Sequence, residues 1–166
     1  MANATSDTLS GHAFAKIPSA DRKSLEPATR HLIFRVEKER YALPLEAVRE
    51  VVVPPTQWSR VPRAPPSVQG VINLRGRVVT VVELRGLFAV EGQSANQKII
   101  LLDRGRRDLG LLVTEVEGIE SIERIVPGPA HPTPSVLGVA HLSGKPVSVL
   151  DAEGVDRAVS SLFAGN

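Results

Sequence analysis

The stretch Pro66-Ser67-Val68-Gln69-Gly70-Val71-Ile72-Asn73-Leu74-Arg75-Gly76 returns 68 residues later as Pro134-Ser135-Val136-Leu137-Gly138-Val139-Ala140-His141-Leu142-Ser143-Gly144. Over positions 66–86, ten of 21 residues match their counterparts without a gap, whereas ordinary residue frequencies would give about one or two matches. The same shift places Leu43 and Leu45 over Leu111 and Val113. We therefore expect two copies of one folding unit.

Each copy has the pattern of short strands joined by turns. Residues 32–36 and 41–45 are apolar runs that flank the charged turn 37–40, which is typical of a hairpin. Thirteen glycines and thirteen prolines punctuate the chain, and they suit many strands and turns. We predict an all-β fold of two packed five-stranded small β-barrels with short helices, because closing a sheet removes its exposed edges.

The boundaries follow from the repeat. The duplicated region covers 31–155, with a first barrel at about 31–90 and a second at about 97–155. Residues 1–30 have no lasting periodicity and are predicted to be a mobile arm. Residues 156–166 are predicted to form a short C-terminal helix or tail, with the helix near Val155 to Phe163.

Composition argues against several classes of protein. No apolar run approaches the length of a membrane span, so we expect no direct membrane insertion. The absence of cysteine removes disulfides and thiolate metal sites and suits a cytoplasmic protein. Small barrels often bind nucleic acids, but the net charge is only +2 and aromatic residues are 4% of the chain. Nucleic-acid binding is therefore a distant alternative, since stacking platforms need aromatic side chains.

The residues that enzymes use are sparse. The four histidines lie at 12, 31, 131 and 141 and have no metal-ligand spacing. Neither a nucleophile elbow nor a phosphate-binding glycine loop is present. We therefore expect no catalytic residue, no metal and no cofactor, and we interpret the chain as not an enzyme.

The differences between the copies point to function, because shared residues are explained by the fold. Glu50 is aligned with Gly118, and Arg75 with Ser143. A carboxylate and a guanidinium at two element ends of one small barrel fit each other as a fork. From sequence alone, an ion pair and two separate solvated charges are equally good interpretations.

Several motifs together resemble the CheW family of bacterial chemotaxis coupling proteins. They are Tyr41-Ala42-Leu43-Pro44-Leu45, Val48-Arg49-Glu50-Val51, Val61-Pro62-Arg63-Ala64-Pro65, Gly70-Val71-Ile72-Asn73-Leu74-Arg75-Gly76, residues 78–85, Gly110-Leu111-Leu112-Val113 and Gly138-Val139-Ala140. The resemblance implies two five-stranded barrels with a hydrophobic groove between them. It also implies a non-enzymatic adaptor that couples methyl-accepting chemotaxis receptors to a CheA-type histidine kinase, with other CheW-like proteins as further partners.

The resemblance also suggests where the receptor binds. The expected receptor-binding residues are Val48, Glu50, Val51, Val71, Asn73, Arg75, Leu112 and Val113. The chain departs from the family pattern at Thr80, Glu83 and Thr114. These departures leave open an alternative, an accessory array spacer that binds receptor but has weakened or lost kinase binding.

Overall fold

The computed structural model describes residues 28–92, 96–103, 108–127 and 135–164. Nearly all of the predicted N-terminal arm therefore lies outside the described residues. The elements are β1 (Thr29–Val36), β2 (Glu39–Pro44), η1 (Leu45–Ala47), β3 (Val48–Val52), β4 (Val68–Leu74), β5 (Arg77–Glu83), α3 (Leu84–Leu87), β6 (Lys98–Leu102), β7 (Leu109–Val113), β8 (Glu115–Ile122), β9 (Val136–Leu142), β10 (Lys145–Leu150) and α4 (Ala152–Ala164). The predicted C-terminal helix is confirmed and begins three residues earlier than expected.

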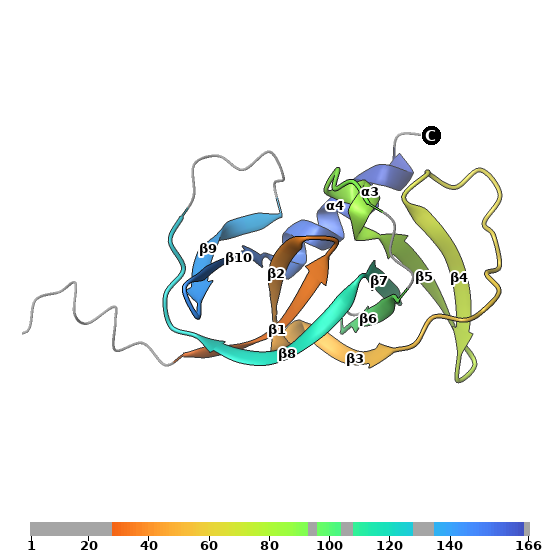
Figure 1. Ribbon diagram of the computed structural model, residues 1–166. Coiled ribbons are helices and arrows are strands. Elements are labelled where there is room, and N and C mark those ends of the chain that lie inside the picture. The colour runs from red at the N-terminus through yellow and green to blue at the C-terminus, as the bar shows by residue number, and fades with distance from the viewer. Residues whose placement is uncertain (1–27, 93–95, 104–107, 128–134, 165–166) are drawn as a thin grey trace, which may run out of the picture.

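The described residues form two five-stranded sheets, as the predicted all-β fold requires, and neither sheet is a fully closed barrel. Sheet A has the order β8-β1-β2-β10-β9, and sheet B has the order β3-β6-β7-β5-β4. Figure 1 shows sheet A on the left and sheet B on the right, with α4 lying across the back between them.

The duplication is confirmed by strand register. In the β4–β5 hairpin Val68 pairs with Val82 and Gly70 with Val81, with a bulge between the two pairs. In the β9–β10 hairpin Val136 pairs with Leu150 and Gly138 with Val149, again with an irregular register between them. Each of these pairs lies 68 residues after its counterpart, so the two copies share backbone geometry as well as sequence.

The predicted division into a barrel at 31–90 and another at 97–155 is wrong, because the copies exchange strands. Strands β1 and β2 of the first copy lie in sheet A with β8, β9 and β10 of the second copy. Strands β6 and β7 of the second copy lie in sheet B with β3, β4 and β5 of the first. The physical reason is the short connection at Leu45–Ala47 between β2 and β3. To stay in the sheet of β1 and β2, β3 would have to pair with β1 and so run parallel to β2. Three residues are too few for that return.

Among the described residues, one backbone bridge connects the two edges of each sheet. Ser59, beyond β3, bridges Val71 of β4, and Val126, beyond β8, bridges Val139 of β9. Gly70 permits the first approach, since its φ is 155° and an added Cβ would lie 2.7 Å from the Ser59 carbonyl oxygen. Each sheet therefore curls until its two edges meet at this bridge, and its edge strands are not joined by a continuous ladder of hydrogen bonds. We call the place where the edges meet the seam.

Alternation along the strands fills three cores. In β1, Leu32 and Phe34 enter a core shared between the two sheets, whereas Ile33 enters the interior of sheet A. In β6, Ile100 and Leu102 enter the shared core and Leu101 enters the interior of sheet B. Both faces of the central strands are therefore buried, and this explains their nearly continuous apolar sequences. From α4, Ala152, Val155 and Val159 cover the shared core.

The only tyrosine of the chain lies in the shared core. The ring of Tyr41 lies 5.9 Å from that of Phe34 and 5.0 Å from that of Phe88, measured between centroids. Burial raises the pKa of Tyr41 to about 12, and the negative charge of Glu39 adds to the shift. The hydroxyl is therefore neutral throughout the physiological range.

Candidate functional site: the seam face of sheet B

The expected site residues converge in part on the outer side of sheet B, beside its seam. Ile72 and Leu74 of β4 pack into the interior of sheet B, so strand alternation turns Val71 and Asn73 outward. On β3, Val52 packs inward, and Val51 points outward with 37% of its surface exposed. Val53, the first residue after the strand, is 74% exposed. We call Val51, Val53, Val71 and Asn73 the seam face.

Glu50 and Arg75 form an ion pair, which decides between the two interpretations left open by the sequence. Arg75 Nη1 donates to Glu50 Oε1 at 2.9 Å, and Arg75 Nη2 donates to Glu50 Oε2 at 3.1 Å. The geometry is the two-pronged fork of arginine on a carboxylate. The Arg75 side chain is 74% exposed and that of Glu50 is 26% exposed, so the pair lies at the surface.

The hairpin between β4 and β5 holds the arginine in place. Arg75 and Gly76 have φ values of 53° and 82°, the left-handed conformations of a tight turn. The Asn73 side-chain oxygen accepts a hydrogen bond from the Gly76 backbone N–H at 3.0 Å. Because β3 and β4 are the two edge strands, the Glu50–Arg75 pair spans the seam of sheet B. Asn73 is thus tied into the turn that presents Arg75.

Three of the expected site residues do not lie on this surface. Leu112 and Val113 are 2% and 1% exposed, because β7 lies in the middle of sheet B and is covered on both faces. Leu112 belongs to the interior of sheet B and Val113 to the shared core. Val48 packs against the same shared core. The prediction of an open groove lined by these residues is therefore wrong, because their side chains pack into the cores of the two sheets.

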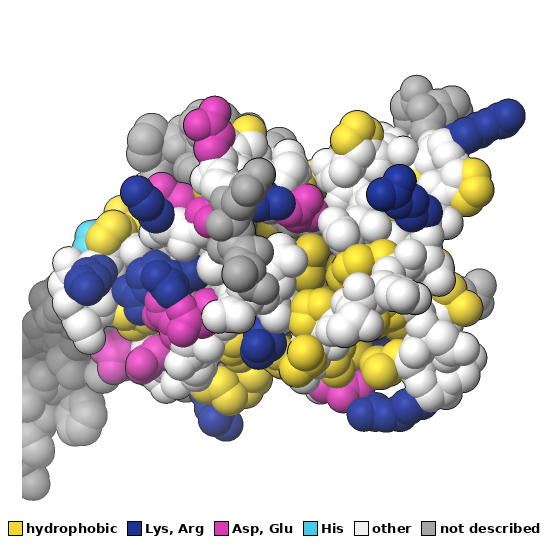
Figure 2. Space-filling model, turned by 45° about the vertical axis from the view of Figure 1, so that its right-hand side comes forward, with side chains coloured by type: hydrophobic (Ala, Val, Ile, Leu, Met, Phe, Trp, Pro, Cys, Tyr) yellow, Lys and Arg dark blue, Asp and Glu magenta, His cyan; other side chains and the backbone are white. Residues whose placement is uncertain are grey.

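A recess lies beside the seam and was not predicted. It has a volume of about 490 Å³ and is lined by Trp58, Arg60, Val61, Ala64, Pro65, Pro66, Val68 and Gln69. Val53, the most exposed apolar residue of β3 and its flanks, was also missed. Because Val52 faces the interior of sheet B, strand alternation predicts that the next residue, Val53, faces solvent. In Figure 2, hydrophobic side chains gather on the right-hand part of the molecule, and acidic and basic side chains are interspersed on the left.

The described residues offer no metal centre of protein ligands. No group of three or more His, Asp or Glu side chains lies close enough to hold a metal ion within 28–92, 96–103, 108–127 and 135–164. Among the helices that the structure describes, none is long and apolar enough to cross a membrane.

Comparison with known proteins agrees with the fold and the motifs. The model of the CheW-like domain family matches residues 30–159. The chain belongs to the CheW-like domain family. A crystal structure of the CheW scaffolding protein TtCheW from Thermoanaerobacter tengcongensis has a TM-score of 0.68 and 27% identity, and the match covers 75% of this chain and 89% of that one.

Curated CheW proteins are similar in sequence as well. The chemotaxis protein CheW of Klebsiella aerogenes is 35% identical over 102 residues, which are 59% of this chain and 61% of that protein. The chemotaxis protein CheW of Rhizobium meliloti is 31% identical over 150 residues, which are 80% of this chain and 91% of that protein. The chain thus spans about three-fifths of the Klebsiella relative and nearly all of the Rhizobium one.

Proposed function

We propose that this chain is a non-enzymatic chemotaxis adaptor that acts in the cytoplasm and couples methyl-accepting receptors to a CheA-type histidine kinase. Membership of the CheW-like family supports the proposal at the level of the whole domain. The observation that carries it further is the seam face, where exposed apolar side chains lie beside a surface ion pair that the other sheet lacks. The equivalent positions in sheet A are Gly118 and Ser143.

The receptor partner that fits this surface is an amphipathic helix. Helix-in-groove recognition needs apolar contacts bordered by polar groups. Val51, Val53 and Val71 supply the apolar contacts, and Arg75 with Glu50 supplies the polar border. The recess lined in part by Trp58 offers a place for a side chain of the partner. Aromatic side chains that fill such recesses often contribute much of the binding energy of an interface. We therefore move the proposed receptor site from the space between the sheets to the seam face.

The residues that suggested lost kinase binding are partly engaged within the chain. The Thr114 hydroxyl accepts a hydrogen bond from the Glu37 backbone N–H at 2.7 Å and so supports the β1–β2 hairpin. Glu83 is paired with Arg85, which also contacts Glu37 at 3.3 Å. Because these side chains have internal partners, their departure from the family pattern does not by itself remove a docking surface. This favours the adaptor over the spacer.

A reconstitution experiment tests the proposal. The purified chain would be titrated into a receptor cytoplasmic fragment, into the regulatory domain of CheA, and into both together. An adaptor binds each partner and brings them into one complex. Receptor binding without kinase binding would establish the spacer instead, and binding to neither would overturn both functions. The Val51→Asp variant places a charge on the seam face and should abolish receptor binding, while Leu137→Asp on the exposed surface of sheet A should not.

A further inference from the structure

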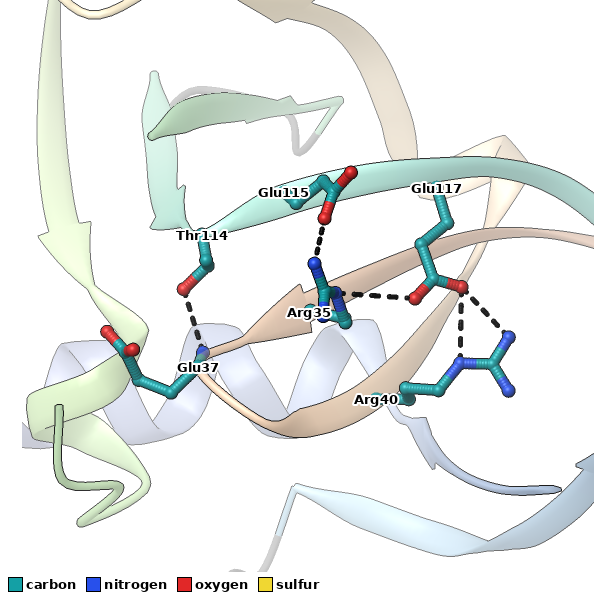
Figure 3. A network of polar contacts seen from close by, with 6 residues as sticks. All are labelled: Arg35, Glu37, Arg40, Thr114, Glu115 and Glu117. Atoms are coloured by element: carbon teal, nitrogen blue, oxygen red, sulfur yellow. Dashed lines mark hydrogen bonds and ion pairs between the residues drawn. The ribbon is translucent and has the colours of Figure 1, made fainter. Parts of the chain in front are cut away.

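The strand exchange brings two clusters of ion pairs to the contact between the halves of the chain. In the first cluster, Arg40 Nη2 lies 2.9 Å from Glu117 Oε2, and Arg35 Nε lies 3.5 Å from Glu117 Oε1. Arg35 also pairs with Glu115. Figure 3 shows these side chains meeting across β1, β2 and β8. Arginines of the first half thus meet carboxylates of the second.

The second cluster lies in sheet B and has the same arrangement. Arg49 Nη1 lies 3.2 Å from Asp108 Oδ1, and Arg77 Nη2 lies 2.7 Å from the same oxygen. Arg49 Nη2 also lies 3.8 Å from Asp103 Oδ1. Here too, both arginines belong to the first half and both carboxylates to the second.

Equivalent positions carry opposite charges. A shift of 68 residues places Arg35 over Asp103, Arg40 over Asp108 and Arg49 over Glu117. At these three pairs of positions the two clusters are the same contact with opposite signs. Arg77 and Glu115 do not follow the reversal, because their counterparts are Lys145 and Ala47. Across both clusters, as far as the structure describes the chain, the first half supplies only cations and the second half only anions.

Backbone pairing alone does not distinguish unlike halves from like halves, because the equivalent ladders between the halves, β1–β8 with β3–β6 and β2–β10 with β5–β7, have the same registers. A half cannot close on itself, since β3 would then run parallel to β2 with β1 between them, and the three-residue connection at Leu45–Ala47 is too short for that return. The competing arrangement is exchange between two chains, in which β1 of one molecule pairs with β3 of another and β2 pairs with β5, as their counterparts do here. In that arrangement, Arg49 would face Arg35 and Arg40 of the other molecule.

We propose that these two clusters are the specificity determinants that make each half pair with the opposite half and that prevent exchange between like halves of two chains. Asp108 and Arg40, which lie at the centres of the two clusters, are 14% and 21% exposed, so solvent screens their charges incompletely. Glu115, Asp103 and Arg77 are more than half exposed and contribute less. Like first halves would bring Arg35, Arg40 and Arg49 together without the carboxylates that pair with them. Like second halves would bring Asp103, Asp108 and Glu117 together, with Lys145 at the position of Arg77 as their cation. This inference is independent of the proposed function.

Two substitutions reverse the preference without altering net charge. In the full-length Arg49→Glu, Glu117→Arg variant, the new carboxylate at position 49 faces Asp103 and Asp108 within the chain, and the new guanidinium at position 117 faces Arg35 and Arg40. Between like halves of two molecules, the same substitutions create attractive pairs. After refolding from urea over a range of concentrations, we expect a lower unfolding midpoint than wild type. We also expect a molecular mass by light scattering that doubles as concentration rises, under conditions where the wild type does not change.

Disulfide trapping identifies which halves have paired, because the chain has no cysteine of its own. Arg30 lies opposite Ser121 in the β1–β8 ladder, and Val53 is the counterpart of Ser121 in the first half. An Arg30→Cys, Ser121→Cys pair should crosslink within the wild-type chain. An Arg30→Cys, Val53→Cys pair should crosslink only between like halves, and therefore only in the charge-reversed background, as a covalent dimer.

The neutral variant Arg49→Gln, Glu117→Gln is the matched control, because it removes the ion pairs without creating new ones. It should lose stability but give no dimer and no crosslink between positions 30 and 53. If the charge-reversed chain does not refold, Arg49→Glu alone carries the same test on one cluster. The proposal is overturned if the reversed chains that fold stay free of that crosslink, or if the neutral variant forms it to the same extent.

Discussion

A double-mutant cycle on Glu50 and Arg75 separates the structural contribution of their ion pair from its contribution to binding. The substitutions are Glu50→Gln, Arg75→Gln and the two combined, which remove charge while keeping a long polar side chain. Gln at position 75 keeps a Cβ on the same left-handed backbone, so the turn is not relaxed by the change. Ser143→Gln is the matched control, because Ser143 occupies the equivalent turn of sheet A with a φ of 52°.

The expected stability coupling is small. The fork has two good hydrogen bonds, at 2.9 and 3.1 Å, but the guanidinium is 74% exposed. Exposed pairs contribute roughly 0.2–1 kcal/mol. With a urea dependence of about 1–3 kcal/mol per molar, each single variant should lower the unfolding midpoint by no more than about 1 M. The swapped variant Glu50→Arg, Arg75→Glu should recover most of that loss.

Binding to the receptor fragment should respond differently. If Arg75 borders the receptor site, the Arg75→Gln variant should weaken binding at least about tenfold, which corresponds to about 1.4 kcal/mol. The swapped variant should stay weak, because it restores the pair but not the position of the positive charge. Isothermal titration and urea unfolding on the same samples measure both effects. The reasoning is refuted if the Arg75→Gln variant keeps its receptor affinity and the coupling energy between Glu50 and Arg75 in unfolding is well above ~1 kcal/mol. The ion pair would then stabilise the fold across the seam and have no part in binding.

Three further perturbations test other parts of the structure. Because Tyr41 keeps its proton to about pH 12 when folded but only to about 10 when unfolded, its stabilising contribution is complete below pH ~10. That contribution then falls by about 1.4 kcal/mol per pH unit up to pH ~12. Tyr41→Phe should remove this fall, and tyrosinate absorbance follows the single tyrosine directly; a titration near pH ~10 in the folded chain would contradict the assignment. Gly70→Ala should destabilise the chain more than Gly76→Ala, since both have positive φ but only Gly70 lies against a backbone carbonyl; equal thermal shifts would exclude a close approach at the seam. Leu112→Ala should lower the free energy of unfolding by about 2–5 kcal/mol without a specific loss of receptor affinity. Val51→Ala should weaken receptor binding and leave the free energy of unfolding nearly unchanged. If Leu112→Ala weakens receptor binding in a chain of unchanged stability, Leu112 belongs to the binding surface.

The repeat, the hairpins and the fold class could be predicted from sequence because they depend on local patterns. Strand exchange could not, since an internal repeat says which segments are alike but not which copy each strand joins. The three residues at 45–47 carry part of that information, because so short a connection cannot return β3 to the sheet of β2. With hindsight, the reversed charges at positions 35 and 103, 40 and 108, and 49 and 117 mark the contact between the halves.

The candidate site was predicted in part for a similar reason. Glu50 and Arg75 stood out because their counterparts lack charge, and the structure brings them together. Leu112 and Val113 come from a stretch that is apolar at every position, and such a stretch is typical of a strand buried on both faces. That pattern indicates core rather than a binding surface. The exchange that places β7 at the centre of sheet B explains why both residues are covered.

Strand exchange also bears on how an adaptor of this kind transmits force between partners. The seam face belongs to β3 and β4, but β3 is hydrogen-bonded to β6 of the other half. Successive residues of β6 enter two different cores, so moving β3 relative to its neighbours would disturb the packing of both. Close-packed interiors resist such continuous deformation. If a partner binds the seam face as proposed, we therefore expect the two sheets to move together as one rigid body rather than about a hinge between them.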